Sequence, residues 1–253
     1  MHLKGLRRFF VEEILKSDKI CAIKGSEAKH ITKVLKMGRG ERLIIMDGKG
    51  TRFLASIESA SPREVRVLLE TPLPSPTPSP IRIILCQSLL KSRNMDLLIQ
   101  KTSELGVDSV LPFSSERTVV RLPANSVAHK QRHWLQIAQS SAKQADRATP
   151  AEIGPPNSFE GLIADWKGQD ALKAILWEAE ETQYLKDLLK MSSQASSFVG
   201  IVGPEGGFLQ EEIDMAKGAG FMPVSLGNRV LRSETAAITL VALVQYELGD
   251  LGL

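Results

Sequence analysis

The sequence predicts two parts, a small β-barrel with one helix followed by a larger α/β domain built on a mostly parallel sheet. Three observations lead to this prediction. Short apolar runs dominate residues 1–70, a proline-rich segment occupies residues 71–80, and apolar runs alternate with amphipathic segments over residues 81–253. Alternating prolines fit neither a helix nor a central strand and favour an extended chain, so residues 71–80 are interpreted as a semi-rigid linker between two domains.

The first part is expected to contain five strands and one helix. Asp47-Gly48-Lys49-Gly50 is typical of a hairpin turn, because glycine tolerates a positive φ. Ser26 is a candidate N-cap of the helix, whose apolar stripe consists of Ile31, Val34 and Leu35. The expected strands, each a short run of apolar or β-branched residues, cover residues 8–11, 20–23, 42–46, 53–57 and 65–69.

The second part is expected to form a sheet with helices on both faces, because buried apolar strands alternate with amphipathic helices. In such sheets ligands bind beyond the carboxyl ends of the strands. The expected strands cover residues 81–87, 110–113, 172–178, 198–202 and 223–226, and the expected helices cover residues 94–105, 126–147, 209–217 and 234–248.

Composition narrows the class of protein. A hydrophobic fraction of 43% and a charged fraction of 24% are those of an ordinary globular protein. A net charge of +3 permits a nucleic-acid partner without requiring one. Cys21 and Cys86 are too few for a disulfide framework or a zinc knuckle, and no metal is expected. No segment approaches a membrane span or a signal peptide, so a cytoplasmic location without membrane contact is expected.

Three segments at the ends of expected strands carry unusual sequences: Leu176-Trp177-Glu178, Gly203-Pro204-Glu205-Gly206-Gly207 and the run 226–236. The glycine-rich segment opens a helix, where free backbone N–H groups can receive a polar ligand. Its spacing is neither that of a P-loop nor GxGxxG, which disfavours a triphosphate or a dinucleotide. A tight connection between strand and helix is the alternative explanation.

The run 226–236 combines two arginines with the start of an apolar helix. Helix capping by Ser233 or Thr235, with Glu234 near the positive end of the helix dipole, explains the hydroxyls and the acid. It does not explain Arg229 and Arg232, which flank an apolar pair. Apolar walls, backbone groups and two cations suit a flat heterocycle beside a phosphate-bearing partner.

These segments resemble the cofactor signature of the SPOUT methyltransferases, and the chain is similar over nearly its whole length to the bacterial 16S rRNA (uracil-N3)-methyltransferase family. The specific part of the match is GPEGG followed by LGNRVLRSETA. Asn228 stands where proline is common, Ser233 replaces threonine, and Asp146 replaces serine or glycine. Further matching segments are residues 7–10, 30–35, 47–48, 101–107, 115–119 and 144–150.

The resemblance implies a PUA-like RNA-binding barrel over residues 1–70 and a SPOUT methyltransferase domain over residues 81–253. The implied domain carries a deep trefoil knot, an exception to the usual topology rules, and the implied protein is a homodimer. The implied cofactor is S-adenosyl-L-methionine in a bent form. The residues implied to bind it are Leu176, Trp177, Glu178, Val202, Gly203, Pro204, Glu205, Gly206, Gly207, Leu226, Gly227, Val230, Leu231, Arg232, Glu234, Thr235 and Ala236.

The implied reaction needs help at the nucleophile, because the lone pair of neutral uracil N3 is delocalised into two carbonyls. A catalyst must remove the N3 proton, stabilise the resulting anion, or do both. Arg232 is the candidate that orients the base and stabilises charge on its carbonyl oxygens, since arginine stays protonated. Glu205 or Glu234 is the candidate proton acceptor, and solvent is the alternative.

The expected partner is 16S rRNA within the assembled small ribosomal subunit. Phosphate contacts would position this substrate without reading its sequence. A relative acting on transfer RNA or on a ribose 2′-hydroxyl, and a non-enzymatic RNA-binding or ribosome-assembly protein, are the alternatives. His30 is interpreted as a structural residue. The candidate RNA contacts are Arg7, Arg8, Lys36 and Arg39 in the first domain and Arg93, Arg117, Arg121 and Arg147 in the second.

Overall fold

The computed structural model describes residues 5–11, 13–14 and 19–252 and divides into two compact units. Met1–Thr77 and Ala142–Pro150 form the first unit. Pro78–Ser141 and Ala151–Leu253 form the second. The sequence carried no signal that residues 142–150 belong with the first unit.

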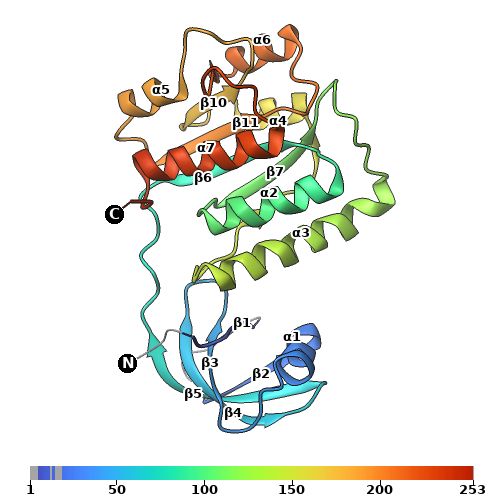
Figure 1. Ribbon diagram of the computed structural model, residues 1–253, viewed down its shortest axis with the longest axis vertical. Coiled ribbons are helices and arrows are strands. Elements are labelled where there is room, and N and C mark those ends of the chain that lie inside the picture. The colour runs from blue at the N-terminus through green and yellow to red at the C-terminus, as the bar shows by residue number, and fades with distance from the viewer. Residues whose placement is uncertain (1–4, 12, 15–18, 253) are drawn as a thin grey trace. The chain divides into compact units, whose positions relative to one another are not determined.

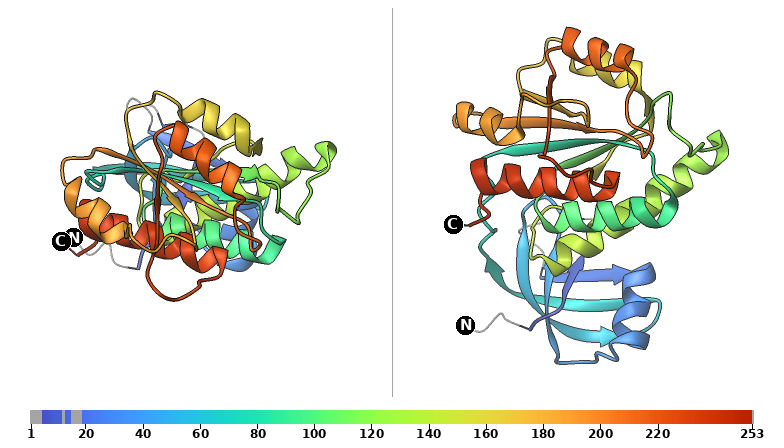
Figure 2. Two further views of the ribbon diagram at one scale, coloured as in Figure 1. Left: turned by 90° about the horizontal axis from the view of Figure 1, so that it is seen from above. Right: turned by 45° about the horizontal axis from the view of Figure 1, so that its top comes forward.

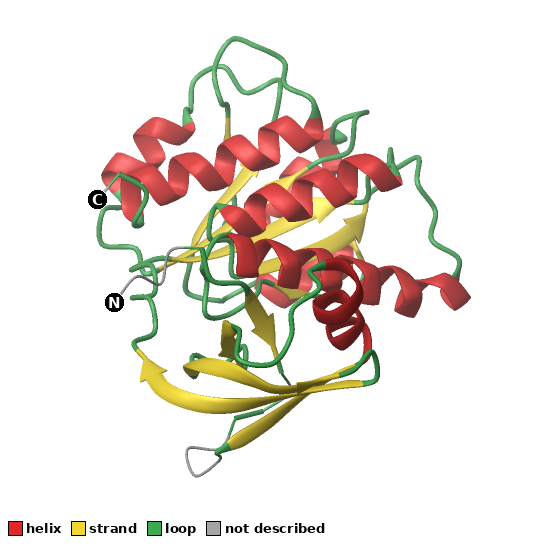
Figure 3. Ribbon diagram, turned by 60° about the horizontal axis from the view of Figure 1, so that its bottom comes forward, coloured by secondary structure: helices red, strands yellow, loops and turns green. Residues whose placement is uncertain are grey.

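The first unit is a five-stranded, curved sheet with one helical segment (Figure 3). The strand order is β1-β3-β4-β5-β2, and all neighbours are antiparallel except β1 and β3. Its core includes Phe9, Ile31 and Val67. The predicted barrel-like domain with one helix is confirmed. The elements are β1 (Arg8–Phe10), β2 (Ile20–Lys24), α1 (Gly25–Lys29), η1 (His30–Val34), β3 (Arg42–Met46), β4 (Arg52–Ala60) and β5 (Glu64–Leu73).

Three local predictions can be compared with this unit. The turn between β3 and β4 forms as expected, with Asp47 Oδ1 accepting hydrogen bonds from the backbone N–H groups of Lys49 and Thr51 at 2.8 and 2.9 Å. Ser26 is not the N-cap, because the helix already begins at Gly25. Val34 is 69% exposed and does not belong to the buried stripe. It ends η1, a π-helical stretch whose wider turn rotates it away from the core.

The extended segment between the two units is shorter than the linker predicted over residues 71–80. β5 continues to Leu73, and its last residues Pro72 and Leu73 pair with Phe53 and Arg52 of β4. Proline is tolerated at such a strand end, since the ladder loses only one donor. Extended chain outside any element begins after Leu73.

Asp146 joins residues 142–150 to the strands of the first unit. Its Oδ1 accepts hydrogen bonds from Arg8 Nε and Arg52 Nη2, both at 2.6 Å. Lys143 pairs with Glu27 of α1 at 2.7 Å. Asp146 also ends the preceding helix, because it adopts a left-handed φ of 58° and the Arg147 N–H donates to the Ala142 carbonyl at 2.9 Å. The expected helix over residues 126–147 is therefore too long at its carboxyl end.

Replacing Asp146 by asparagine is expected to destabilise the first unit. Asparagine tolerates the left-handed backbone, so the change removes the charge and little else. The side chain of Arg52 is only 5% exposed and would lose its counter-charge. We expect the free energy of unfolding to fall by about 1–2 kcal/mol in urea denaturation.

The matched control for this change is Glu64→Gln, which removes the exposed ion pair between Glu64 and Lys24. Exposed pairs contribute about 0–1 kcal/mol, so this variant should unfold close to wild type. Equal effects of the two substitutions would contradict a specific role of Asp146.

The second unit is a parallel sheet with helices on both faces, as predicted (Figure 1). The strand order is β12-β10-β11-β6-β7-β8, and β9 also pairs with β7. The strands are β6 (Arg82–Ser88), β7 (Ser109–Ser114), β8 (Glu152–Ile153), β9 (Asn157–Ser158), β10 (Leu172–Leu176), β11 (Ser197–Val202) and β12 (Met222–Val224). The helices are α2 (Ser92–Glu104), α3 (Ala124–Gln144), α4 (Phe159–Trp166), α5 (Leu185–Met191), α6 (Gln210–Gly218) and α7 (Ser233–Leu248).

Two apolar cores lie on the two faces of this sheet. Residues of α2, α3, α5 and α7 contribute to one core, and residues of α4 and α6 to the other. Figure 2 shows these two groups of helices on opposite sides of the strands. Strand residues alternate between the cores, so that Leu85 faces α7 and Cys86 faces the opposite core.

The last helix is fixed at its carboxyl end by a buried glutamine. Gln245 Nε2 donates to the Gly106 carbonyl at 3.2 Å, and Gln245 Oε1 accepts from the Ser79 hydroxyl at 3.0 Å.

Within the described ranges, no helix is long and apolar enough to cross a membrane. Over the same residues, no three His, Cys, Asp or Glu side chains gather in a way that could hold a metal ion.

Candidate active site

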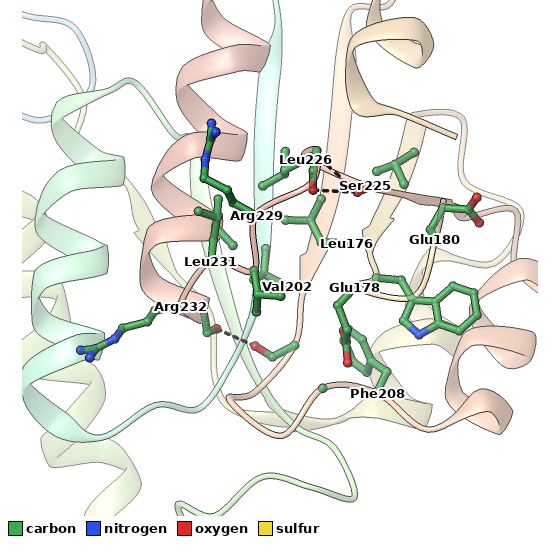
Figure 4. A pocket seen from close by; sticks show the side chains of 18 of the residues that line it. Leu176, Glu178, Glu180, Val202, Phe208, Ser225, Leu226, Arg229, Leu231 and Arg232 are labelled. Carbon is green, nitrogen blue, oxygen red and sulfur yellow. Dashed lines mark hydrogen bonds between the residues drawn. The ribbon is translucent and has the colours of Figure 1, made fainter. Parts of the chain in front are cut away.

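A pocket of about 770 Å³ lies at the carboxyl ends of three neighbouring strands of the second unit (Figure 4). Strands β12, β10 and β11 are adjacent and parallel, so the loops that follow them meet at one edge of the sheet. These loops are called here loop 1 (177–184, after β10), loop 2 (203–209, after β11) and loop 3 (225–232, after β12). The volume is within the range of about 300–1,000 Å³ typical of small-molecule sites.

Most of the residues predicted to bind a cofactor line this pocket. Gly206, Glu234 and Thr235 do not line it. The predicted residues that do are Leu176, Trp177, Glu178, Val202, Gly203, Pro204, Glu205, Gly207, Leu226, Gly227, Val230, Leu231, Arg232 and Ala236. The lining residues absent from the predicted set are Glu180, Glu181, Tyr184, Phe208, Val224, Ser225, Asn228, Arg229 and Ser233.

Loop 1 and loop 3 are joined by backbone hydrogen bonds. The Ser225 N–H donates to the Gln183 carbonyl at 2.8 Å, and the Leu185 N–H donates to the Ser225 carbonyl at 3.0 Å. At the start of loop 1, the Trp177 N–H donates to the Val224 carbonyl at 3.1 Å. These bonds fix one side of the pocket independently of its side chains.

Loop 2 needs its glycines for space and for conformation. Gly207 has a φ of 70°, and a Cβ built on it would collide with the carboxylate of Glu178. A Cβ on Gly203 would lie 2.8 Å from the ring of Phe208. The Gly207 N–H donates to the Pro204 carbonyl at 3.0 Å and closes a tight turn. The compact strand–helix connection considered from the sequence therefore exists and also forms a pocket wall.

A buried glutamate and an arginine hold loop 2 from outside the pocket. Glu212, 7% exposed, accepts hydrogen bonds from the N–H groups of Leu209 at 2.8 Å and Glu116 at 3.1 Å. Arg117 Nη1 donates to the Gly206 carbonyl at 3.0 Å. Loop 2 is thereby attached to the segment that follows β7.

The pocket has an apolar side and an acidic side. Leu176, Val202 and Leu231 point toward one another in Figure 4, whereas Glu178 and Glu180 lie on the other side. Hydrogen bonds from the Thr182 hydroxyl, and then from the backbone N–H groups of Thr182 and Gln183, lower the pKa of Glu180 and keep it ionised. A ligand that combines an apolar ring with a positive charge matches this distribution.

Two arginines extend away from the apolar cluster (Figure 4). Arg229 and Arg232 are exposed residues of loop 3, and their guanidinium groups point outward in different directions. Arg232 is the N-cap of α7, where its carbonyl accepts a hydrogen bond from the Ala236 N–H at 2.8 Å. Its charged group is therefore available to a substrate that approaches the edge of the pocket.

The predicted capping of α7 by Ser233 or Thr235 is wrong. The helix has no side-chain cap, because Ser233 lies one residue inside it and its hydroxyl donates to the Gly203 carbonyl of loop 2 at 2.5 Å. Glu234 is 7% exposed, and its Oε2 has no hydrogen-bond partner among the described residues. Of the two candidate proton acceptors, only Glu205 lines the pocket, and it is exposed.

The candidate RNA contacts fall into two groups. Arg8 is engaged by Asp146, and Arg147 belongs to the first unit, whereas the sequence placed it in the second domain. Arg147 belongs with the first unit because the ion pairs of Asp146 and Lys143 hold residues 142–150 there. The exposed candidates are Arg7, Lys36 and Arg39 in the first unit and Arg93, Arg117 and Arg121 in the second.

Sequence reasoning missed the acidic part of loop 1 and the aromatic residue of loop 2. Glu180, Glu181 and Tyr184 lie beyond the short segment after β10 that the sequence singled out. The N–H groups of Thr182 and Gln183 donate to Glu180 Oε1, but the sequence did not indicate this turn, because glutamate is not among the residues that favour turns. Phe208 carried no signal, because an apolar residue before a helix is ordinary.

Family models match both units. The model described as RNA methyltransferase domain matches residues 77–245, and the model described as RNA methyltransferase PUA domain matches residues 23–70. The ribosomal RNA small subunit methyltransferase E of Bacillus subtilis is 25% identical over 248 residues, which cover 96% of this chain and 97% of the relative.

Solved structures are similar over nearly the whole length of the chain. A putative methyltransferase from Legionella pneumophila, in complex with the bound cofactor SAM, has a TM-score of 0.89 and 32% identity, with 97% of this chain and 99% of that chain covered. A ribosomal RNA small subunit methyltransferase E from Neisseria gonorrhoeae, bound to S-adenosyl methionine, has a TM-score of 0.86 and 28% identity, with the same coverage. The chain therefore belongs to the ribosomal RNA small subunit methyltransferase E family of RNA methyltransferases.

Proposed function

We propose that this protein transfers the methyl group of S-adenosylmethionine to N3 of a uridine in 16S rRNA of the small ribosomal subunit. The observation that carries the proposal is the pocket at the ends of β10, β11 and β12, lined by the two segments that resemble the cofactor signature. Relatives over nearly the full chain are named ribosomal RNA small subunit methyltransferase E, and the Neisseria gonorrhoeae structure is bound to S-adenosyl methionine.

The residues of the pocket fit this cofactor. The apolar side, formed by residues such as Leu176, Val202 and Leu231, suits a flat adenine ring. The acidic side, with Glu178 and Glu180, suits the positive charge of the amino group and the sulfonium. Because Gly207 has no side chain, the Glu178 carboxylate can lie directly against loop 2, where a Cβ would collide with it. When bound, the cofactor supplies a methyl group that is already activated, so no metal is required.

The chain's own contribution to the reaction is to make uracil N3 nucleophilic. The N3 proton must leave, and the negative charge then spreads over two carbonyl oxygens. Arg232, exposed at the edge of the pocket, is the residue that we propose orients the base and stabilises this charge. Glu205 on loop 2 is the proposed proton acceptor, since Glu234 does not line the pocket.

The proposed RNA contacts are distributed over both units. The PUA-like domain, residues 1–70, would hold RNA through Arg7, Lys36 and Arg39, and residues 81–253 would form the catalytic domain with Arg93, Arg117 and Arg121. All six side chains are exposed. Such contacts bind phosphates irrespective of sequence, which suits a large, preformed substrate such as the small subunit. With ribosomal RNA as substrate, the proposed place of action is the cytoplasm.

The proposal includes a trefoil knot and a homodimer. β12 lies at one edge of the sheet, whereas α7 packs against β6, β11 and α2 in its middle. Loop 3 makes this crossing while it is hydrogen-bonded to loop 1, an arrangement that favours a threaded chain. On α7, Leu243 and Tyr246 are 41% and 66% exposed, and we propose that a second copy covers them.

The test of substrate class is transfer of labelled methyl groups from S-adenosylmethionine to purified small subunits from cells that lack this enzyme. Label in 16S rRNA is expected. Label confined to transfer RNA would mean that transfer RNA, and not 16S rRNA, is the substrate. Absence of both label and cofactor binding would favour a non-enzymatic RNA-binding protein.

A further inference from the structure

A buried glutamine lies beneath the pocket without lining it. Gln87 is the sixth residue of β6, fully buried, and pairs in register with Val202, the last residue of β11. It follows Leu85 on the face of the sheet that α7 covers. Its Nε2 donates to the Ser88 carbonyl and to the Ser233 hydroxyl oxygen, both at 3.0 Å. Ser233 in turn donates to the Gly203 carbonyl.

The direction of this hydrogen-bond chain is determined by its ends. The carbonyls of Ser88 and Gly203 can only accept. Ser233 has one hydroxyl proton, and it is given to Gly203, so towards Gln87 the hydroxyl oxygen must accept. The amide nitrogen of Gln87, and not its oxygen, must therefore face both neighbours. A side chain of the same shape with only acceptors at this position would oppose the arrangement.

This hydrogen-bond chain joins loop 2 to the end of loop 3. Gly203 is the first residue of loop 2, and Ser233 follows the last residue of loop 3. Loop 1 and loop 3 are already joined through Ser225 by backbone bonds. Backbone hydrogen bonds thus hold loop 1 against loop 3, and the hydrogen bonds of Gln87 and Ser233 hold loop 2 against the end of loop 3.

We propose that Gln87 is a positioning residue for S-adenosylmethionine binding, a role that rests on the proposed function. Gln87 holds the Ser233 hydroxyl in the orientation that restrains Gly203, and so keeps loop 2 at the distance from loop 3 that the cofactor requires. Both residues lie outside the set that the sequence assigned to the cofactor.

The test measures S-adenosylmethionine affinity by calorimetry and the thermal unfolding midpoint of the same full-length variants. Gln87→Glu keeps the shape but offers at most one donor, even when protonated, in place of the two N–H groups that Ser88 and Ser233 receive, and Ser233→Ala removes the relay. Each is expected to weaken cofactor binding about tenfold, the scale of one buried hydrogen bond, and to leave the KM for RNA near wild type. Ser233→Thr, which retains the hydroxyl, is expected to recover most of the affinity that Ser233→Ala loses.

The matched control is Gln245→Met, which removes another fully buried glutamine from the same unit, at the opposite end of α7. It should lower the unfolding midpoint without weakening cofactor binding. If Gln87→Glu does not fold, Gln87→Met tests the same donor. Cofactor affinity at the wild-type level in these variants, or a loss equal to that of Gln245→Met, would overturn the role of Gln87 alone. Absence of cofactor binding by the wild-type protein would overturn the proposed function as well.

Discussion

Replacing Arg232 by alanine is expected to lower kcat for methyl transfer by about 100- to 1,000-fold, the range found when a donor to a developing oxyanion is removed. Arg232 lies at the edge of the pocket with an exposed guanidinium group, and among the described residues its hydrogen bond is made by its backbone carbonyl, which accepts from Ala236. The fold and the start of α7 should therefore survive the change. Single-turnover rates on small subunits, measured with saturating cofactor, would report the effect.

Two further variants separate geometry from charge. Arg232→Lys keeps the charge without the planar fork and should recover only part of the rate. Arg63→Ala removes an exposed cation from the turn between β4 and β5 and should leave kcat unchanged. A rate for Arg232→Ala within threefold of wild type would remove this residue from the mechanism and leave the cofactor pocket unaffected.

Replacing Gly207 by alanine is expected to weaken cofactor binding by about 100-fold, because a left-handed alanine costs about 1–2 kcal/mol and a displaced neighbour about as much again. The added Cβ would meet the Glu178 carboxylate across the pocket. In the free protein loop 2 can relax, and binding must then restore the strained form. Equilibrium titration with S-adenosylmethionine measures the loss.

Gly218→Ala is the control for this substitution. Gly218 ends α6, has an ordinary φ, and a Cβ there meets nothing within 4 Å. This variant should bind the cofactor as wild type does and should be slightly more stable, since alanine favours the helix. Binding by Gly207→Ala that matches Gly218→Ala would mean that loop 2 does not contact the cofactor.

Long periodic segments were predicted well because they carry strong local signals. The apolar face of α2 and the apolar run of β11 are buried as expected, and β3 has the predicted bounds, Arg42–Met46. The short elements α4, α5, β8 and β9 were missed, since helices of one or two turns and two-residue strands depend on tertiary contacts more than on periodicity. Ser158, which caps α4 by accepting from the Gly161 N–H, was a readable signal.

Long-range contacts could not be predicted. No local pattern relates Gln87 to Ser233, 146 residues apart, or Asp146 to Arg8 and Arg52. The same limit applies to the start of α7, where a capping rule favoured Ser233 as the N-cap. Instead, the Ser233 hydroxyl donates its hydrogen bond to Gly203 of loop 2, which is distant in sequence. Glycine-rich loops after strands, in contrast, located the pocket because parallel strands bring their carboxyl ends to one edge.

The most direct test of the proposed reaction is the identity of the methylated nucleoside. Small subunits from cells lacking this enzyme would be incubated with the protein and S-adenosylmethionine, and the digested 16S rRNA analysed by mass spectrometry. We expect N3-methyluridine with wild-type protein and, over the same short reaction time, at least about 100-fold less of it with Arg232→Ala. A ribose-methylated nucleoside, or N3-methyluridine formed equally well by Arg232→Ala, would contradict it.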